Sequence, residues 1–165
     1  MTSVIPLEYY APAFGLFLLL LLVIFVPRER YKELFWFGLV WGFLFSTAVT
    51  FLISEVFHLF HYERVMPFIL FGAPLWLTFA WIPAVMLYLY FLPEGGEWYV
   101  FPLYLVGFAV AGMEIDGVLN QGGLLVYDRW APFCRFILSL AWFYLVALHY
   151  RHCRVRGRKI PPASP

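Results

Sequence analysis

The sequence predicts an all-α fold: a polytopic transmembrane bundle of five helices, with the N-terminus outside the cell and the C-terminus in the cytoplasm. Three observations predict it, namely the apolar composition, a series of five long apolar segments, and the distribution of Lys and Arg between their connections. Of 165 residues, 64% are hydrophobic and 13% are charged, whereas about 25% are charged in a soluble domain. A small domain has too much surface for its volume to bury so many apolar side chains. Lipid is therefore expected to surround much of the chain.

Each expected helix has the roughly 20 apolar residues that a bilayer crossing needs. The five helices are predicted over residues 9–27, 34–60, 67–92, 98–119 and 131–150. The connections between them are short, and each contains charged or turn-forming residues. The chain is thus predicted to be a single transmembrane domain, 1–165, with a basic cytoplasmic tail over 151–165.

Two of these helices contain residues that should affect their packing. We expect the third helix to bend at its prolines, which are Pro67, Pro74 and Pro83. In the fourth helix, Gly107 and Gly112 should allow a neighbouring helix to approach closely. Glu114 and Asp116 interrupt the same helix, but they lie about 24 Å or more along its axis from Trp98, near the outer headgroups.

The positive charges support an odd number of crossings. With the N-terminus outside, the first connection, the third connection and the tail hold eight Lys and Arg residues, against three on the outer side. Cytoplasmic segments of membrane proteins carry such an excess. The predicted location is therefore the cell membrane, as a multi-pass protein.

The tail and the two cysteines exclude some classes of partner and cofactor. Five Lys and Arg residues lie in the last fifteen positions, and we expect them to attract anionic lipid and not nucleic acid. Cys134 and Cys153 lie at opposite ends of one helix, about 28 Å apart, so they do not pair within one chain. Neither belongs to a zinc-ligand pattern, and no metal or other cofactor is predicted.

A group of ionisable residues is predicted near the outer ends of the helices. Ser46, Thr50 and Ser54 lead to this group along one face of the second helix. The candidate ligand-binding residues are Glu55, His58, His61, Glu114, Asp116, Asp128 and Arg135. Ionisable side chains inside a membrane bundle are expected to pair or to act in function. We expect Arg135 to pair with Glu114 or Asp116, and His58 to pair with Glu55 or Glu114.

Several roles for this group stay open from the sequence alone. The charges could simply fix helix packing, or they could form a site for a small polar ligand, a lipid or a membrane partner, including another copy of the chain. A single E-x-x-H does not make a di-iron site, which needs two such motifs and two further Glu residues. The favoured function is a non-enzymatic bundle of undetermined activity with a polar binding cluster near its outer face. The alternative is an intramembrane enzyme that acts on a lipid or isoprenoid with Glu, Asp and His as acid and base groups.

Several short motifs resemble a family of small five-span membrane proteins of unknown function from spore-forming Gram-positive bacteria. They are the basic start after the first helix, His61-Tyr62, the run Tyr90-Phe91-Leu92-Pro93-Glu94, Glu114 within the fourth helix, and Tyr127-Asp128-Arg129-Trp130. The resemblance covers about three quarters of the chain. It implies a membrane location and five helices, and it implies no activity.

Overall fold

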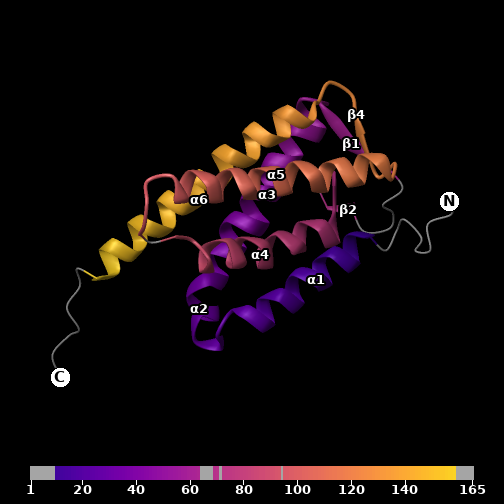
Figure 1. Cartoon of the computed structure of the whole chain (residues 1–165). Coiled ribbons are helices and arrows are strands. Elements are labelled where there is room, and N and C mark those ends of the chain that lie inside the picture. Colours follow the sequence, from indigo (N-terminus) through magenta and orange to yellow (C-terminus); the bar gives the residue numbers. More distant parts are fainter. Residues whose placement is uncertain (1–9, 64–68, 71, 94, 159–165) are drawn as a thin grey trace.

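The protein is a bundle of apolar helices (Figure 1). A computed structural model describes residues 10–63, 69–70, 72–93 and 95–158. The helices are α1 (Tyr10–Phe25), a continuous second helix formed by α2 (Arg28–Phe37), η2 (Gly38–Phe45), α3 (Ser46–Phe51) and η3 (Leu52–Val56), then α4 (Leu75–Tyr90), α5 (Val100–Gln121) and α6 (Pro132–Arg158). The segments η2 and η3 are π-helical turns within the second helix.

Three of these helices are long and apolar enough to cross a membrane. They are Arg28–Val56, Val100–Gln121 and Pro132–Val155. The helices α1 and α4 have 16 residues each, which makes them about 24 Å long, against a hydrocarbon core of about 30 Å. Length and composition therefore support a membrane protein, and the five crossings stay a prediction.

The helices run alternately between two ends of the bundle (Figure 1). We call one end the sheet end, because the strand pair β1 (Phe60–Tyr62) and β4 (Leu125–Tyr127) lies there. We call the other the loop end; it holds the α1–α2 turn, the α4–α5 connection and the last residues of α6. The strands pair antiparallel, with His61 opposite Val126. They tie the end of the second helix to the connection between α5 and α6.

The predicted third helix is wrong at its beginning. Residues 69–70 (β2) and 73–74 (β3) pair as two very short strands, and α4 starts only at Leu75. Gly72 has a φ of +77°, a conformation that glycine adopts without strain. Pro74 has no N–H to donate to a helix and caps α4 in an extended conformation. Pro83 alone lies within the helix, and Pro67 lies outside the described residues.

The predicted tail is also partly helical, because α6 continues to Arg158. Its first residues therefore extend the last predicted span as a helix at the loop end (Figure 1). Residues 159–165 lie outside the described part of the chain.

Small residues bring the helices together, and the structure agrees with the sequence prediction for one of the two glycines of the fourth predicted helix. A methyl group on Gly112 would lie 2.8 Å from Oγ of Ser139, so α5 and α6 touch there. No atom lies within 4 Å of such a methyl on Gly107, and the prediction for that residue is wrong. The second helix and α4 approach each other more closely at Gly42, where a methyl would lie 2.4 Å from the carbonyl oxygen of Trp81. The second helix and α4 are therefore packed backbone to backbone.

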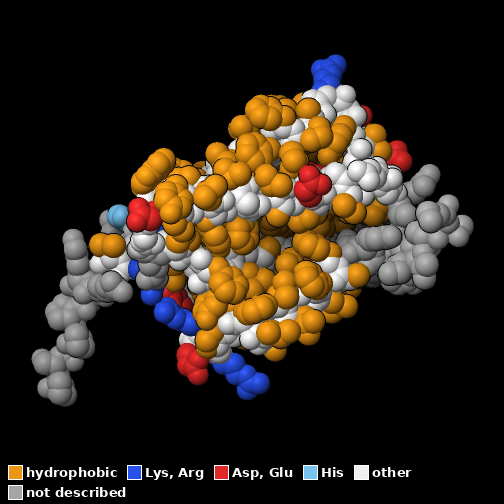
Figure 2. Space-filling model, in the orientation of Figure 1, with side chains coloured by type: hydrophobic (Ala, Val, Ile, Leu, Met, Phe, Trp, Pro, Cys, Tyr) orange, Lys and Arg blue, Asp and Glu red, His pale blue; other side chains and the backbone are white. Residues whose placement is uncertain are grey.

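The outside of the bundle is apolar. Side chains such as Leu16, Val23 and Phe133 are each about two-thirds exposed. Figure 2 shows hydrophobic side chains over the flank of the bundle on one face, with most of the charged ones toward the two ends. Such a surface is suited to lipid and not to water.

Candidate polar site at the sheet end

An ion pair between α5 and α6 forms the centre of the candidate site. Nε of Arg135 lies 3.3 Å from Oδ2 of Asp116, and the two side chains are 15% and 3% exposed. Gly112 and Ser139 lie one turn further along the same two helices and are in contact. The small residue at 112 lets the antiparallel helices approach closely enough for the pair to form. Of the two partners expected for Arg135, the structure shows Asp116.

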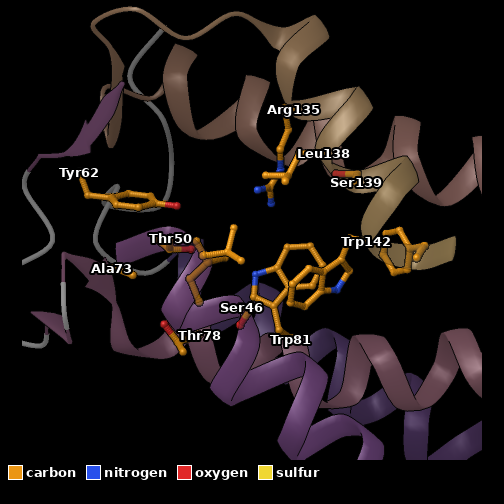
Figure 3. Close-up of a pocket in the computed structure, with 13 residues that line it drawn as sticks. Ser46, Thr50, Tyr62, Ala73, Thr78, Trp81, Arg135, Leu138, Ser139 and Trp142 are labelled. Atoms are coloured by element: carbon orange, nitrogen blue, oxygen red, sulfur yellow. The ribbon is translucent and has the colours of Figure 1, made fainter. Parts of the chain in front are cut away.

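The Arg135 guanidinium also faces a cavity within the bundle. Its Cζ lies 5.5 Å from the ring centroid of Trp81, over the ring face. Figure 3 shows Arg135 and the Tyr62 hydroxyl directed from different elements toward the space above Trp81. The polar side chains that line this cavity are Ser46, Thr50, Tyr62, Thr78, Arg135 and Ser139. Trp81, Trp142 and Phe143 are among its apolar and aromatic walls.

Two of the lining hydroxyls already donate to backbone carbonyls. Ser46 Oγ donates to Gly42 O, and Thr78 Oγ1 donates to Pro74 O at 3.1 Å. Because a hydroxyl has one hydrogen to donate, these two oxygens can only accept further hydrogen bonds. The cavity therefore combines acceptor oxygens with the donors of one guanidinium.

The cavity has a volume of about 40 Å³. A buried water molecule needs roughly 10–15 Å³ on this measure, whereas small-molecule pockets have about 300–1,000 Å³. The space admits a few water molecules or the end of one narrow polar group. It does not hold a complete lipid headgroup or a drug-sized molecule.

Three buried donors in this region have no hydrogen-bond acceptor among the described residues. They are the Tyr127 hydroxyl, Nε1 of Trp130 and Nε of Arg135. The Arg135 Nε is near the Asp116 carboxylate, but the pair does not have hydrogen-bond geometry. Burial, followed by the charge of Asp116, raises the pKa of Tyr127, so its hydroxyl stays protonated. An unsatisfied buried donor costs about 1–3 kcal/mol, so the site is expected to take up water or a ligand with acceptor atoms.

The strand pair β1–β4 lies beside this site at the sheet end of the bundle. Tyr62 of β1 contributes its ring to the cavity, and burial raises its pKa above the usual range. On the exposed side of the sheet, His61 Nδ1 lies 2.7 Å from Asp128 Oδ2, and its Nε2 lies 3.4 Å from Glu63 Oε1. The hydrogen bond to Asp128 raises the pKa of His61. His61 and Asp128 therefore connect the strands at the surface and do not line the cavity.

The other candidate residues lie away from the ion pair. Glu55, His58 and Glu114 are all exposed. A methyl on Gly72 would collide with the Glu55 carboxylate, so that carboxylate lies against the β2–β3 turn. His58 has a φ of +49° just after the second helix ends. No hydrogen bond or ion pair joins His58 to Glu55 or Glu114 in the described structure, so those expected pairings are not seen.

The predicted single group thus separates into a buried pair, a surface pair and three exposed side chains. Reasoning from the sequence placed Ser46 and Thr50 on the helix face that leads to this group, but it did not identify Tyr62, Trp81 or Ser139 as site residues. The spacing in the sequence could have indicated Ser139. It follows Arg135 by four residues and so lies on the same face of its helix, just as Gly112 and Asp116, also four residues apart, share a face of α5. Among the described residues, no three His, Cys, Asp or Glu side chains are placed to hold a metal ion.

The comparisons with known proteins give no further guidance: no family model, curated protein or solved structure matches this chain. The resemblance to small five-span proteins of spore-forming bacteria stays a prediction.

Proposed function

We propose that the protein is a non-enzymatic, multi-pass component of the cell membrane that binds the polar end of a small ligand or lipid at its sheet end. The observation that carries this proposal is the buried Arg135 Nε, which has no hydrogen-bond acceptor among the described residues although it lies beside Asp116 at the polar cavity. In the proposed topology the five helices cross the bilayer, and the sheet end faces the outside. The family resemblance is in accord with this topology.

The ion pair indicates the chemistry of the ligand. Asp116 already compensates the charge of Arg135, so a second full negative charge would gain little there. A neutral group with acceptor oxygens, such as an ester carbonyl, an amide carbonyl or a hydroxyl, would accept hydrogen bonds from the Arg135 guanidinium without adding a buried charge. The ligand class we propose is therefore a neutral molecule with a narrow, oxygen-bearing end.

The small cavity argues against the enzyme alternative. An enzyme that acts on a lipid or isoprenoid must enclose the reacting part of its substrate beside its acid and base groups. The space beside Arg135 is about 40 Å³, and Glu55, His58 and Glu114 are exposed outside it. The arrangement supports binding better than catalysis.

Mass spectrometry of the protein purified in nanodiscs tests this proposal. We expect a neutral lipid or small molecule to remain bound to the wild-type protein and to be lost from the Asp116→Leu/Arg135→Met double variant. That variant replaces the pair with apolar side chains of similar size, which a buried site tolerates. Arg129→Met is the matched control, because Arg129 is an exposed arginine in the connection before α6. Equal ligand retention by the wild type and the folded double variant would refute the proposal.

A further inference from the structure

A second site lies at the opposite end of the bundle. A groove with a volume of about 450 Å³ opens between the α4–α5 connection and the last turns of α6. This volume falls within the range of small-molecule sites. The residues that form its floor and rim include Pro93, Trp98, Phe101, Tyr150, Arg151 and Arg154. It shares no lining residue with the cavity at the sheet end.

Arg151 is held in one orientation in this groove. Its Cζ lies 4.2 Å from the ring centroid of Phe101, and one terminal nitrogen donates to Pro93 O at 2.9 Å. The stack on Phe101 fixes the plane of the guanidinium. The hydrogen bond to Pro93 uses one of five N–H donors, and a planar guanidinium binds two oxygens of a phosphate side by side.

A second arginine is positioned on the same wall. Arg154 lies with its Cζ 5.5 Å from the ring centroid of Tyr150 and its Nε 3.8 Å from Glu33 Oε1. The Tyr150 hydroxyl donates to the same Glu33 oxygen at 3.1 Å. Glu33 therefore holds Arg154 and Tyr150 at the groove from the neighbouring α2. Glu97 is the acidic side chain among the described lining residues, and it makes the rim less basic on its side.

The groove lies where a lipid headgroup would be found. Arg151 and Arg154 lie within the last two turns of the apolar segment Pro132–Val155, which is long enough to cross the bilayer. Trp98 is 83% exposed on the rim, and Trp residues concentrate at the membrane interface. Apolar side chains continue from the rim along α5 and α6, with Leu103 and Leu148 exposed. A molecule in this groove would place a polar head against the arginines and apolar chains against the helices.

We propose that this groove is a binding site for the phosphate of an anionic phospholipid, with Arg151 as its main donor. The inference rests on α6 as a membrane span and does not depend on the sheet-end cavity. A phosphodiester headgroup supplies oxygens that accept hydrogen bonds from the two guanidinium groups, and its acyl chains cover the exposed faces of α5 and α6. Binding there would anchor the α4–α5 connection to the end of α6.

Lipid retention in nanodiscs tests the site. The wild-type protein is reconstituted with phosphatidylcholine alone or with added phosphatidylglycerol, and the bound lipid is measured by native mass spectrometry after release from the disc. We expect one phosphatidylglycerol to be retained per chain. Arg151→Gln should weaken that retention about tenfold, because a charge-assisted pair is lost. The matched control Arg28→Gln removes an exposed charge at the same end outside the groove, and it should weaken retention fivefold or less.

Two additional variants and one competition experiment complete the test. Arg151→Lys keeps the charge and removes the planar fork, so it should also weaken retention, and it serves if the glutamine variant does not fold. Soluble glycerol phosphate should not displace the lipid from the wild type. Equal losses in Arg151→Gln and Arg28→Gln, equal retention of both lipids, or displacement by glycerol phosphate would overturn the proposal. The Asp116→Leu/Arg135→Met variant should retain phosphatidylglycerol normally, so failure here and failure at the sheet end are distinguishable.

Discussion

Breaking the buried ion pair should be far more damaging than removing it completely. At 3.3 Å, two unit charges attract by about 5 kcal/mol at an effective dielectric constant of 20, and this attraction offsets the cost of burying them. Asp116→Leu leaves the Arg135 guanidinium buried without a counter-charge, and Arg135→Met does the same to the carboxylate. Each single substitution should therefore lower the free energy of unfolding by about 3–5 kcal/mol. The double variant should lose much less.

A double-mutant cycle measures this coupling. The free energies of unfolding of the wild type, the two single variants and the double variant are compared in mixed micelles. We expect an interaction energy of about 3 kcal/mol or more from the cycle. Arg129→Met should change stability by less than about 0.5 kcal/mol, because Arg129 is exposed. If the effects of the two single substitutions simply add to within about 0.5 kcal/mol, the pair is not coupled, and the reasoning from burial is wrong.

Three further predictions follow from single residues. Gly42→Ala should destabilise the protein by about 1–3 kcal/mol, because the new methyl would meet the Trp81 carbonyl; Gly107→Ala, in open space, should be neutral or stabilising in the same unfolding assay, and equal effects would contradict the packing described. Tyr127→Phe should raise the stability of the ligand-free protein, since it removes a buried donor without an acceptor; a loss of stability would show that the hydroxyl has a partner. Because the pKa of His61 is raised in the folded protein, its stabilising effect should be present below its unfolded pKa of about 6.5 and be lost as pH rises through the folded value. Melting curves across that range should show this loss in the wild type and not in His61→Gln.

The composition of the sequence was sufficient to predict the class of fold. Long apolar segments and short connections predict helices in lipid, and the described helices follow in the expected order. The start of the third helix was not predictable from hydropathy, because residues before Pro74 are as apolar as those after it. Gly72 forms the turn between β2 and β3, and Pro74 caps the start of α4. Both act through backbone conformation, which an average of hydropathy does not detect.

The candidate site was predictable in part. The positions of Asp116 and Arg135 along their predicted helices placed both residues at the same level of the bundle, and the structure shows that they form an ion pair. Helix rotation decided the rest: Glu114 lies two residues from Asp116, about 200° around the helix, and it is exposed where Asp116 is buried. Tyr62 reaches the cavity because β1 pairs with β4. That long-range contact leaves no local signal in the sequence.

The groove at the loop end was not foreseen as a built site. The sequence predicted only that the basic tail as a whole attracts anionic lipid. That prediction does not distinguish one arginine of the tail from another. In the structure, Phe101 and Pro93 orient Arg151, while Glu33 contacts Arg154. These contacts join residues more than 40 positions apart in the chain, so they follow from the fold and not from the composition of the tail.

The orientation of the chain in the membrane is the most direct test of the account. Single-cysteine variants carrying Ser3→Cys, Arg129→Cys or only the native Cys153 would be treated in intact cells with a maleimide that does not cross membranes. We predict labelling of the first two from outside, and labelling of Cys153 only after the membrane is opened. Labelling of residue 3 and Cys153 from the same side would contradict five crossings, and with them the proposed positions of both sites.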